Sequence, residues 1–197
     1  MDDIIVLAGG FSVSQFEPEN LKQYGCKIIG VNDAFLHAPV DIVVSMDRRW
    51  LEYRWEKLKE ARLPTYARYS AYKVNLNGEF FGGLRLFNCD HETDKFSENI
   101  NDLNGRNSGY VAFNLAYINR PKNIYLFGFD MHGGYWYKDY PWTKEKKQNR
   151  SAEWVDGFKI AEKYCDLAGV NVFVVGDSLI NNFPKITFKE FKKRCEK

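Results

Sequence analysis

The stretch from Gly105 to Asp130 reads GRNSGYVAFNLAYINRPKNIYLFGFD. Asn107 and Ser108 can each cap a helix, and the apolar, alanine-spaced residues that follow them predict that helix. A short Arg-Pro-Lys link then leads to a buried strand that is expected to end near Asp130. The stretch is therefore half of a strand-helix-strand unit, and its helix start is polarised positive, which suits an anion such as a phosphate.

Other apolar runs along the chain also stop at small polar residues. Buried strands are predicted at residues 4–7, 26–31, 41–45 and 170–175, with shorter ones at 65–68 and 84–88. Capped or amphipathic segments predict helices at 48–61, 151–168 and 188–197. The expected fold class is Rossmann-like α/β, with a mostly parallel sheet and helices on both faces, in a single domain spanning residues 1–197.

Composition excludes several classes of protein. The 28 basic and 26 acidic residues leave a net charge of +2, which gives no broad electrostatic reason to expect nucleic acid or an anionic membrane as partner. The four cysteines lack paired spacing, so reduced thiols are expected. The N-terminal MDDIIVLAGG has no basic region and too short an apolar run for a signal peptide or membrane span. We expect a soluble, cytoplasmic protein.

The polar strand ends predict a binding crevice. In a parallel sheet they meet along one edge, and the helix start at Asn107 points into the same crevice. Gly9 and Gly10 would let backbone approach a phosphate, although they match no GxGxxG or Walker pattern and such a turn is more often only a turn. Asn32, Asp47 or Asp177 would suit sugar hydroxyls or a base. Together these ends favour a nucleotide site.

Residues 131–150 form the least regular part of the chain. Five aromatic residues in this range argue against disorder, so we interpret it as a lid over the crevice. An oligomer contact is the alternative interpretation, and a homo-oligomer is left open. Asp130 and His132 could share a metal ion, but a structural pair in a turn is the commoner arrangement. No metal ligands are assigned, because the three histidines also lack zinc-site spacing.

Four motifs, in order, resemble a known family. They are AGGFSVSQF after the first strand, GVND after the second, NSGYVAFNLAY followed by IYLFGFDM, and VFVVGDSLINNFP near the end. This combination, spanning residues 4–184, is similar to the small bacterial sialyltransferases that use CMP-sialic acid. It is also similar to related phage-encoded proteins grouped with archaeal 6-hydroxymethylpterin pyrophosphokinase-like (MptE-like) enzymes.

The sialyltransferase resemblance implies roles for particular residues. The family's catalytic histidine lies in the loop before the last helix, where KEKKQNRSAEW has none, so the base is assigned to His132 or Asp130. Tyrosines that assist the departing phosphate are matched by Tyr135, Tyr137 or Tyr140. The residues matched to contacts with the CMP-type donor are Gly9, Gly10, Ser12, Asn32, Asn107, Ser108, Gly109, Asp177 and Ser178.

The leading functional hypothesis is a nucleotide-dependent group transferase, most concretely a glycosyltransferase that uses a CMP-sugar-type donor without an obligatory metal, its acceptor unidentified. A Mg²⁺-ATP-dependent pyrophosphokinase-like transferase is the first alternative, and it would need carboxylates such as Asp47 and Asp130 near one ion. The second is a phage-encoded binding protein that keeps the fold without catalysis, in which case it would work in the host cytoplasm.

Overall fold

The computed structural model describes residues 3–72, 82–90, 92–137, 140 and 151–196. In this part of the chain one eight-stranded sheet has the order β5-β4-β3-β2-β1-β6-β7-β8, and all neighbouring strands pair in parallel. The fold class predicted from the sequence is therefore confirmed. The strands are β1 (Ile4–Leu7), β2 (Lys27–Val31), β3 (Ile42–Ser45), β4 (Thr65–Arg68), β5 (Leu84–Phe87), β6 (Asn123–Phe127), β7 (Asn171–Val175) and β8 (Lys185–Ile186).

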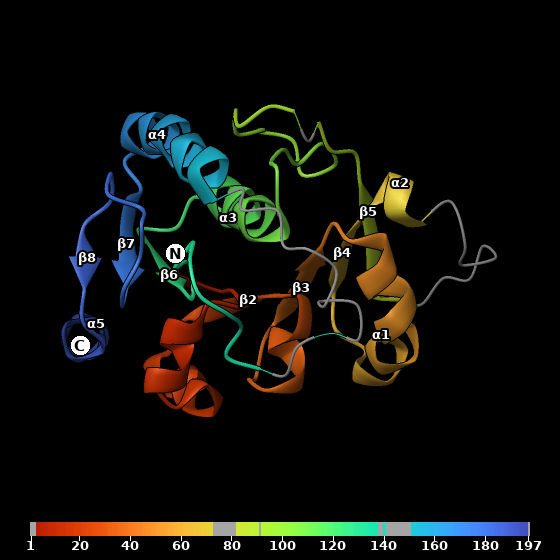
Figure 1. The fold of residues 1–197 in the computed structure, drawn as a ribbon, viewed down its shortest axis with the longest axis horizontal. Helices are drawn as coiled ribbons and strands as arrows, with labels where there is room; N and C mark the ends of the chain where they lie inside the picture. The colour runs from red at the N-terminus through yellow and green to blue at the C-terminus, as the bar shows by residue number, and fades with distance from the viewer. Residues whose placement is uncertain (1–2, 73–81, 91, 138–139, 141–150, 197) are drawn as a thin grey trace.

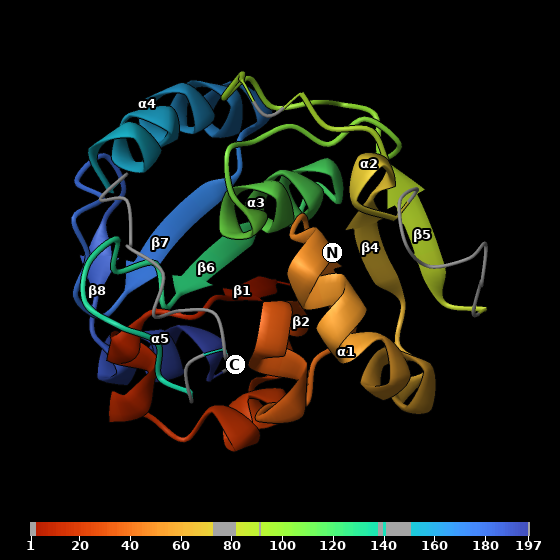
Figure 2. The same cartoon turned by 45° about the vertical axis from the view of Figure 1, so that its right-hand side comes forward.

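Helices cover both faces of the sheet (Figure 1). The α-helices are α1 (Arg48–Ala61), α2 (Tyr69–Tyr72), α3 (Ser108–Ile118), α4 (Ser151–Ala168) and α5 (Phe188–Cys195). The 3₁₀-helices are η1 (Phe11–Gln15), η2 (Pro18–Tyr24) and η3 (Asn32–Leu36). Figure 2 shows α3 and α4 on one face, and α1, α5 and the N-terminal 3₁₀-helices on the other.

Burial on both faces explains why the central strands read as continuous apolar runs. In β1, Val6 packs in the core beneath α3 and α4, whereas Ile5 and Leu7 pack in the core on the opposite face. Successive side chains of a strand point to opposite faces of the sheet, and here helices cover both faces, so neither face of the strand is polar. Helix α3 lies directly on the sheet, and its residues from Tyr110 to Tyr117 are all buried.

Short elements account for the differences between the expected and the observed structure. The segment after β1 forms two 3₁₀-helices, and β8, which the sequence did not predict, pairs over only two residues, Lys185 and Ile186. Elements this short show too few residues for a periodic pattern. All four cysteines are reduced thiols, as expected. None of the helices in the described ranges has the length and apolar character that a bilayer span requires.

The strand order reverses at β1. The chain proceeds from β1 through β2 to β5 on one side, and from β6 to β8 on the other. In open α/β sheets the carboxyl ends of the strands flanking such a reversal form the ligand-binding crevice. The candidate site is therefore expected where the residues after β1 and β6 meet.

Candidate active site

The loops after β1 and β6 are locked together at this reversal. The Gly10 N–H donates to the Gly128 carbonyl at 2.9 Å. Ser12 donates from its backbone N–H to Asp130 Oδ2 at 2.7 Å and from its hydroxyl to Asp130 Oδ1 at 2.5 Å. A Cβ added at Gly10 would lie 2.5 Å from Asp130 Oδ1 and from the Gly128 carbonyl oxygen. Gly10 is therefore needed for close packing rather than for an unusual backbone angle.

These contacts change the role of Asp130 expected from the sequence. Its side chain is buried, with the whole residue 2% exposed, and both of its carboxylate oxygens accept hydrogen bonds from Ser12. A general base must reach the proton that it removes, directly or through one water. The geometry therefore favours a structural role for Asp130, and it leaves the Ser12 hydroxyl engaged inside the protein rather than facing a phosphate.

Ser178 also acts within the protein. Its hydroxyl donates to the Phe129 carbonyl at 2.6 Å and accepts the Ile180 N–H at 3.0 Å. The next residue, Leu179, donates its N–H to the Asp130 carbonyl at 3.0 Å. These bonds hold the loop after β7 against the loop after β6.

His132 and Asp177 meet at the surface of these two loops. His132 Nε2 lies 3.2 Å from Asp177 Oδ2, and the side chains are 43% and 73% exposed. Met131, just before the histidine, has a φ of 62°, in the left-handed region that a bulky residue rarely adopts. The predicted base and a predicted donor-binding residue thus lie in contact, which the sequence did not indicate.

The start of α3 lies at the same edge of the sheet. Asn107 caps the helix, its Oδ1 accepting the Tyr110 N–H at 2.9 Å. The Ser108 hydroxyl accepts the N–H of Met46, directly after β3, at 3.0 Å. A Cβ built on Gly109 would lie 3.4 Å from the Phe129 ring, after β6. Ser108 and Gly109 therefore lie near the ends of β3 and β6, and the cap residue Asn107 directly precedes them.

Asn32 follows β2 in a strained conformation. Its φ is 51°, and its buried side-chain oxygen Oδ1 has no hydrogen-bond partner among the residues that the structure describes. It directly follows β2, which pairs with the central strand β1 as far as Leu7↔Gly30. Strain and an unsatisfied acceptor at one residue mark it as a candidate ligand contact.

The next residue, Asp33, anchors this turn. It is 1% exposed and accepts hydrogen bonds from Trp50 Nε1 at 2.7 Å and from Arg54 Nε and Nη2 at 2.8 and 2.5 Å. The hydrogen bond to Asp33 raises the pKa of the Arg54 guanidinium. Sequence reasoning missed this cluster because its partners lie on α1, and no local pattern links the two positions.

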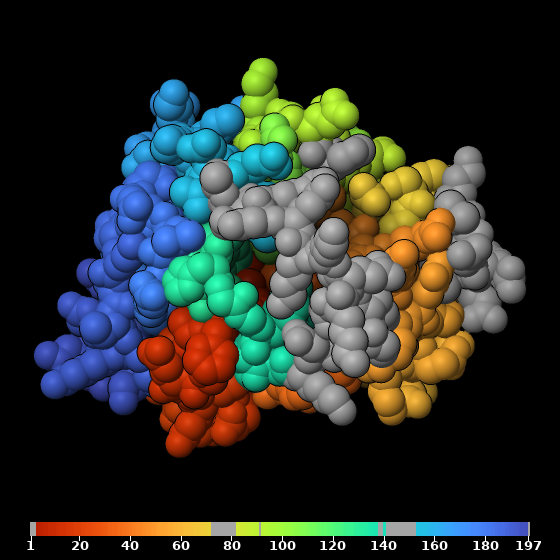
Figure 3. All heavy atoms as spheres, in the orientation of Figure 1, coloured from red at the N-terminus to blue at the C-terminus, as the bar shows by residue number. Residues whose placement is uncertain are grey.

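The described part of the predicted lid, residues 131–137 and Tyr140, lies against the glycine loop. Tyr135 forms an isolated antiparallel bridge with Gly10. Trp136 donates its backbone N–H to the Gly9 carbonyl at 3.2 Å and its ring N–H to the Ala8 carbonyl at 3.0 Å. In Figure 3 this teal segment lies against the red N-terminal segment. Residues 138–139 and 141–150 of the predicted lid lie outside the described residues.

Tyr137 is the centre of a ring stack. Its ring lies between those of His37 and Tyr135, at centroid distances of 5.8 and 5.3 Å and interplanar angles of 7° and 6°. Its hydroxyl accepts a 3.3 Å hydrogen bond from Tyr140. A Cβ built on Gly9 would lie 2.8 Å from this hydroxyl. Burial raises the pKa of Tyr137, so its hydroxyl stays protonated near neutral pH.

The fold is similar to that of a sialyltransferase. The matched structure is the sialyltransferase CstII from Campylobacter jejuni in complex with a substrate analogue, CMP-3FNeuAc. The match has a TM-score of 0.57 and 14% sequence identity, and it covers 94% of this chain and 86% of that chain. No protein-family model and no curated protein sequence matches the chain. The sialyltransferase part of the resemblance therefore holds at the level of the fold, and the pyrophosphokinase-like part gains no support.

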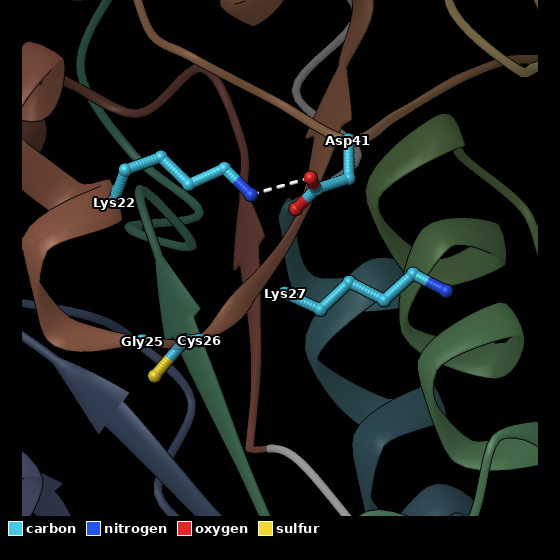
Figure 4. A pocket seen from close by; sticks show the side chains of 5 residues that line it. All are labelled: Lys22, Gly25, Cys26, Lys27 and Asp41. Carbon is cyan, nitrogen blue, oxygen red and sulfur yellow. Dashed lines mark hydrogen bonds and ion pairs between the residues drawn. The ribbon is translucent and has the colours of Figure 1, made fainter.

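A shallow pocket of about 300 Å³ lies at the opposite, amino edge of the sheet (Figure 4). It is lined by Lys22, Gly25, Cys26, Lys27 and Asp41. Lys22 forms an ion pair with Asp41, whose carboxylate also accepts the Ile28 N–H at 2.7 Å. This internal pairing and its position away from the carboxyl ends make the pocket a poor candidate for the site.

Carboxylates expected to hold Mg²⁺ under the pyrophosphokinase hypothesis have other partners. Asp47 caps α1, accepting the N–H groups of Arg49 and Trp50 at 2.8 and 3.3 Å, and Asp130 binds Ser12. Within the described ranges, no group of three or more His, Cys, Asp or Glu residues is arranged to hold a metal ion. These contacts give that hypothesis no structural support.

Proposed function

We propose that this chain is a single nucleotide-binding α/β domain that transfers a sugar from a CMP-sugar-type donor. The observation that carries the proposal is Asn32, which has a left-handed backbone and a buried Oδ1 without a hydrogen-bond partner in the described part of the chain. A buried unsatisfied polar group costs about 1–3 kcal/mol, and a strained backbone conformation costs a similar amount. A donor that supplies an N–H or O–H to Asn32, such as the cytosine amino group or a ribose hydroxyl, would offset the first of these costs.

The leaving phosphate would meet hydrogen-bond donors from two elements. The first N–H groups of α3, at Ser108 and Gly109, have no partner within the helix and carry its positive end. The Tyr137 hydroxyl is the second donor. It accepts a hydrogen bond from the Tyr140 hydroxyl, so its own O–H can donate to the phosphate. Removing one such oxyanion donor from an enzyme typically lowers kcat about 100- to 1,000-fold.

The acceptor proton would go to His132. Its half-exposed ring is accessible to an acceptor arriving from solvent, whereas Asp130 is buried and bonded to Ser12. In this reaction the acceptor oxygen attacks the anomeric carbon as the bond from that carbon to the phosphate oxygen breaks. CMP leaves, and the acceptor proton passes to the imidazole.

Calorimetric titration with CMP, CDP, UDP and ATP tests the binding step. We expect CMP to bind the wild-type protein, and Asn32→Ala to weaken its binding at least 10-fold, about 1.4 kcal/mol. Asn20→Ala is the matched control, because the exposed side-chain amide of Asn20, on η2, donates to Glu17, which directly precedes that helix. Folded wild-type protein that binds none of the four nucleotides would end the proposal, and ATP binding that requires Mg²⁺ would favour the pyrophosphokinase alternative.

A further inference from the structure

The contact between His132 and Asp177 joins the loops after two neighbouring strands at the carboxyl edge. His132 lies in the loop after β6 and Asp177 in the loop after β7, and these strands pair from Asn123↔Asn171 to Phe127↔Val175. The pair is 3.2 Å long and connects Nε2 of the imidazole to Oδ2 of the carboxylate. It therefore engages one defined nitrogen of the ring.

Hydrogen bonds from the residues after Asp177 hold the two loops together. Ser178 and Leu179, which directly follow Asp177, bond the carbonyls of Phe129 and Asp130 at 2.6 and 3.0 Å. Asp130 is itself fixed by Ser12. The loops cannot separate without breaking buried hydrogen bonds, so the main chain that carries the two side chains is preorganised.

We infer that Asp177 is a positioning residue that fixes the tautomer of His132, so that Nδ1 is the nitrogen that takes the acceptor proton. This inference rests on the proposed function. A neutral imidazole carries one N–H donor and one acceptor nitrogen. The negative carboxylate of Asp177, 3.2 Å from Nε2, favours the tautomer that carries its proton on Nε2, and the lone pair is then on Nδ1. After proton transfer both ring nitrogens are protonated, and the carboxylate stabilises the imidazolium, as in other His-Asp pairs.

The exposure of the His132 and Asp177 side chains distinguishes a positioning role from a role in folding stability. The two side chains are 43% and 73% exposed, and exposed ion pairs contribute only about 0–1 kcal/mol to folding. Loss of the Asp177 carboxylate is therefore expected to leave the unfolding midpoint almost unchanged. Its effect is expected on the orientation of His132 and on the chemical step.

The first test reads the His132 ring directly, without any substrate. Nitrogen-15 NMR of the neutral ring, assigned by comparison with His132→Gln, should show the Nε2–H tautomer in the wild-type protein. In Asp177→Ala the shift difference between the two ring nitrogens should narrow as the tautomers mix, and in Asp177→Glu it should recover. Asp156→Ala is the control, since Asp156 is an exposed carboxylate that pairs with Lys159 on α4. A wild-type Nδ1–H tautomer, or an unchanged spectrum in Asp177→Ala, would overturn the inference.

The second test follows CMP release from CMP-sialic acid with water as the acceptor. Asp177→Ala should lower kcat about 10-fold or more while the KM for the donor stays within about twofold, since general-base catalysis contributes roughly 100- to 10,000-fold. Adding Asp177→Ala to His132→Gln should cause no further loss. Wild-type kcat in Asp177→Ala would refute the inference and leave the proposed function standing. A wild-type protein that binds no nucleotide would instead refute the proposed function. The nitrogen-15 spectra of His132 would still test whether Asp177 fixes its tautomer.

Discussion

Asp130→Asn is expected to destabilise the protein as a whole, because Asp130 joins the two loops at the strand reversal. Its buried carboxylate accepts two hydrogen bonds from Ser12, at 2.7 and 2.5 Å. Hydrogen bonds to charged groups contribute about 1.5–3 kcal/mol each. Asparagine keeps one acceptor oxygen but turns an NH₂ group towards the other donor, so we expect a loss of about 2–3 kcal/mol. For a chain of 197 residues this lowers Tm by about 4–12 °C.

Urea unfolding followed by tryptophan fluorescence measures this loss. Asp130→Asn should lower the midpoint without changing the m-value, and Ser12→Ala should lower it less, because only the hydroxyl bond is removed. The double variant should be less destabilised than the sum of the two single changes, since both remove the same interaction. Asp156→Asn, on the exposed face of α4, controls for the loss of a negative charge.

Unchanged stability would refute this assignment of Asp130. If Asp130→Asn unfolds at the wild-type urea concentration but no longer turns over CMP-sialic acid, the carboxylate acts in the reaction rather than in the fold. The same reasoning gives His132→Gln the opposite profile. It should keep the wild-type midpoint, because the exposed ring contributes little to folding.

Three further changes probe the frame of the site. Arg54→Met leaves the buried Asp33 carboxylate without its bidentate partner, so urea unfolding should show a loss of about 3–5 kcal/mol in the free energy of unfolding. A loss below about 1 kcal/mol would mean that other hydrogen bonds are sufficient for Asp33. Gly10→Ala should cost about 1–3 kcal/mol because of the contact with Asp130. Gly134→Ala is the control and should be nearly neutral, because a Cβ there would have no described atom within 4 Å; equal effects of the two changes would contradict the close packing at Gly10. Burial raises the pKa of Cys89 from 9.0 to about 11, so its stabilising contribution is complete below pH 9 and is lost as the pH rises to about 11. Between pH 9 and 11 the free energy of unfolding of Cys89→Ala should therefore fall less steeply than that of the wild type, by up to about 1.4 kcal/mol per pH unit. The same slope in both proteins would contradict the raised pKa of Cys89.

Local patterns were sufficient to predict most helices and strands. The bounds of α1 and α4 agree with the predicted ranges 48–61 and 151–168, because capping and amphipathic spacing act over a few residues. The binding edge also followed from the sequence. Once the apolar runs are assigned to a parallel sheet, their polar carboxyl ends must lie on one side, as Gly10, Asn32 and Asp130 do.

The sequence by itself therefore determined the fold class and which side of the sheet holds the candidate site. Only the tertiary structure decided what each polar residue does there. Asp130 and Asp177 both follow strands and look alike in the sequence, yet one is buried against Ser12, 118 positions away, and the other is exposed beside His132. A carboxylate's role depends on its exposure to water and on the donors within hydrogen-bond distance, and both are set by contacts between residues far apart in the chain.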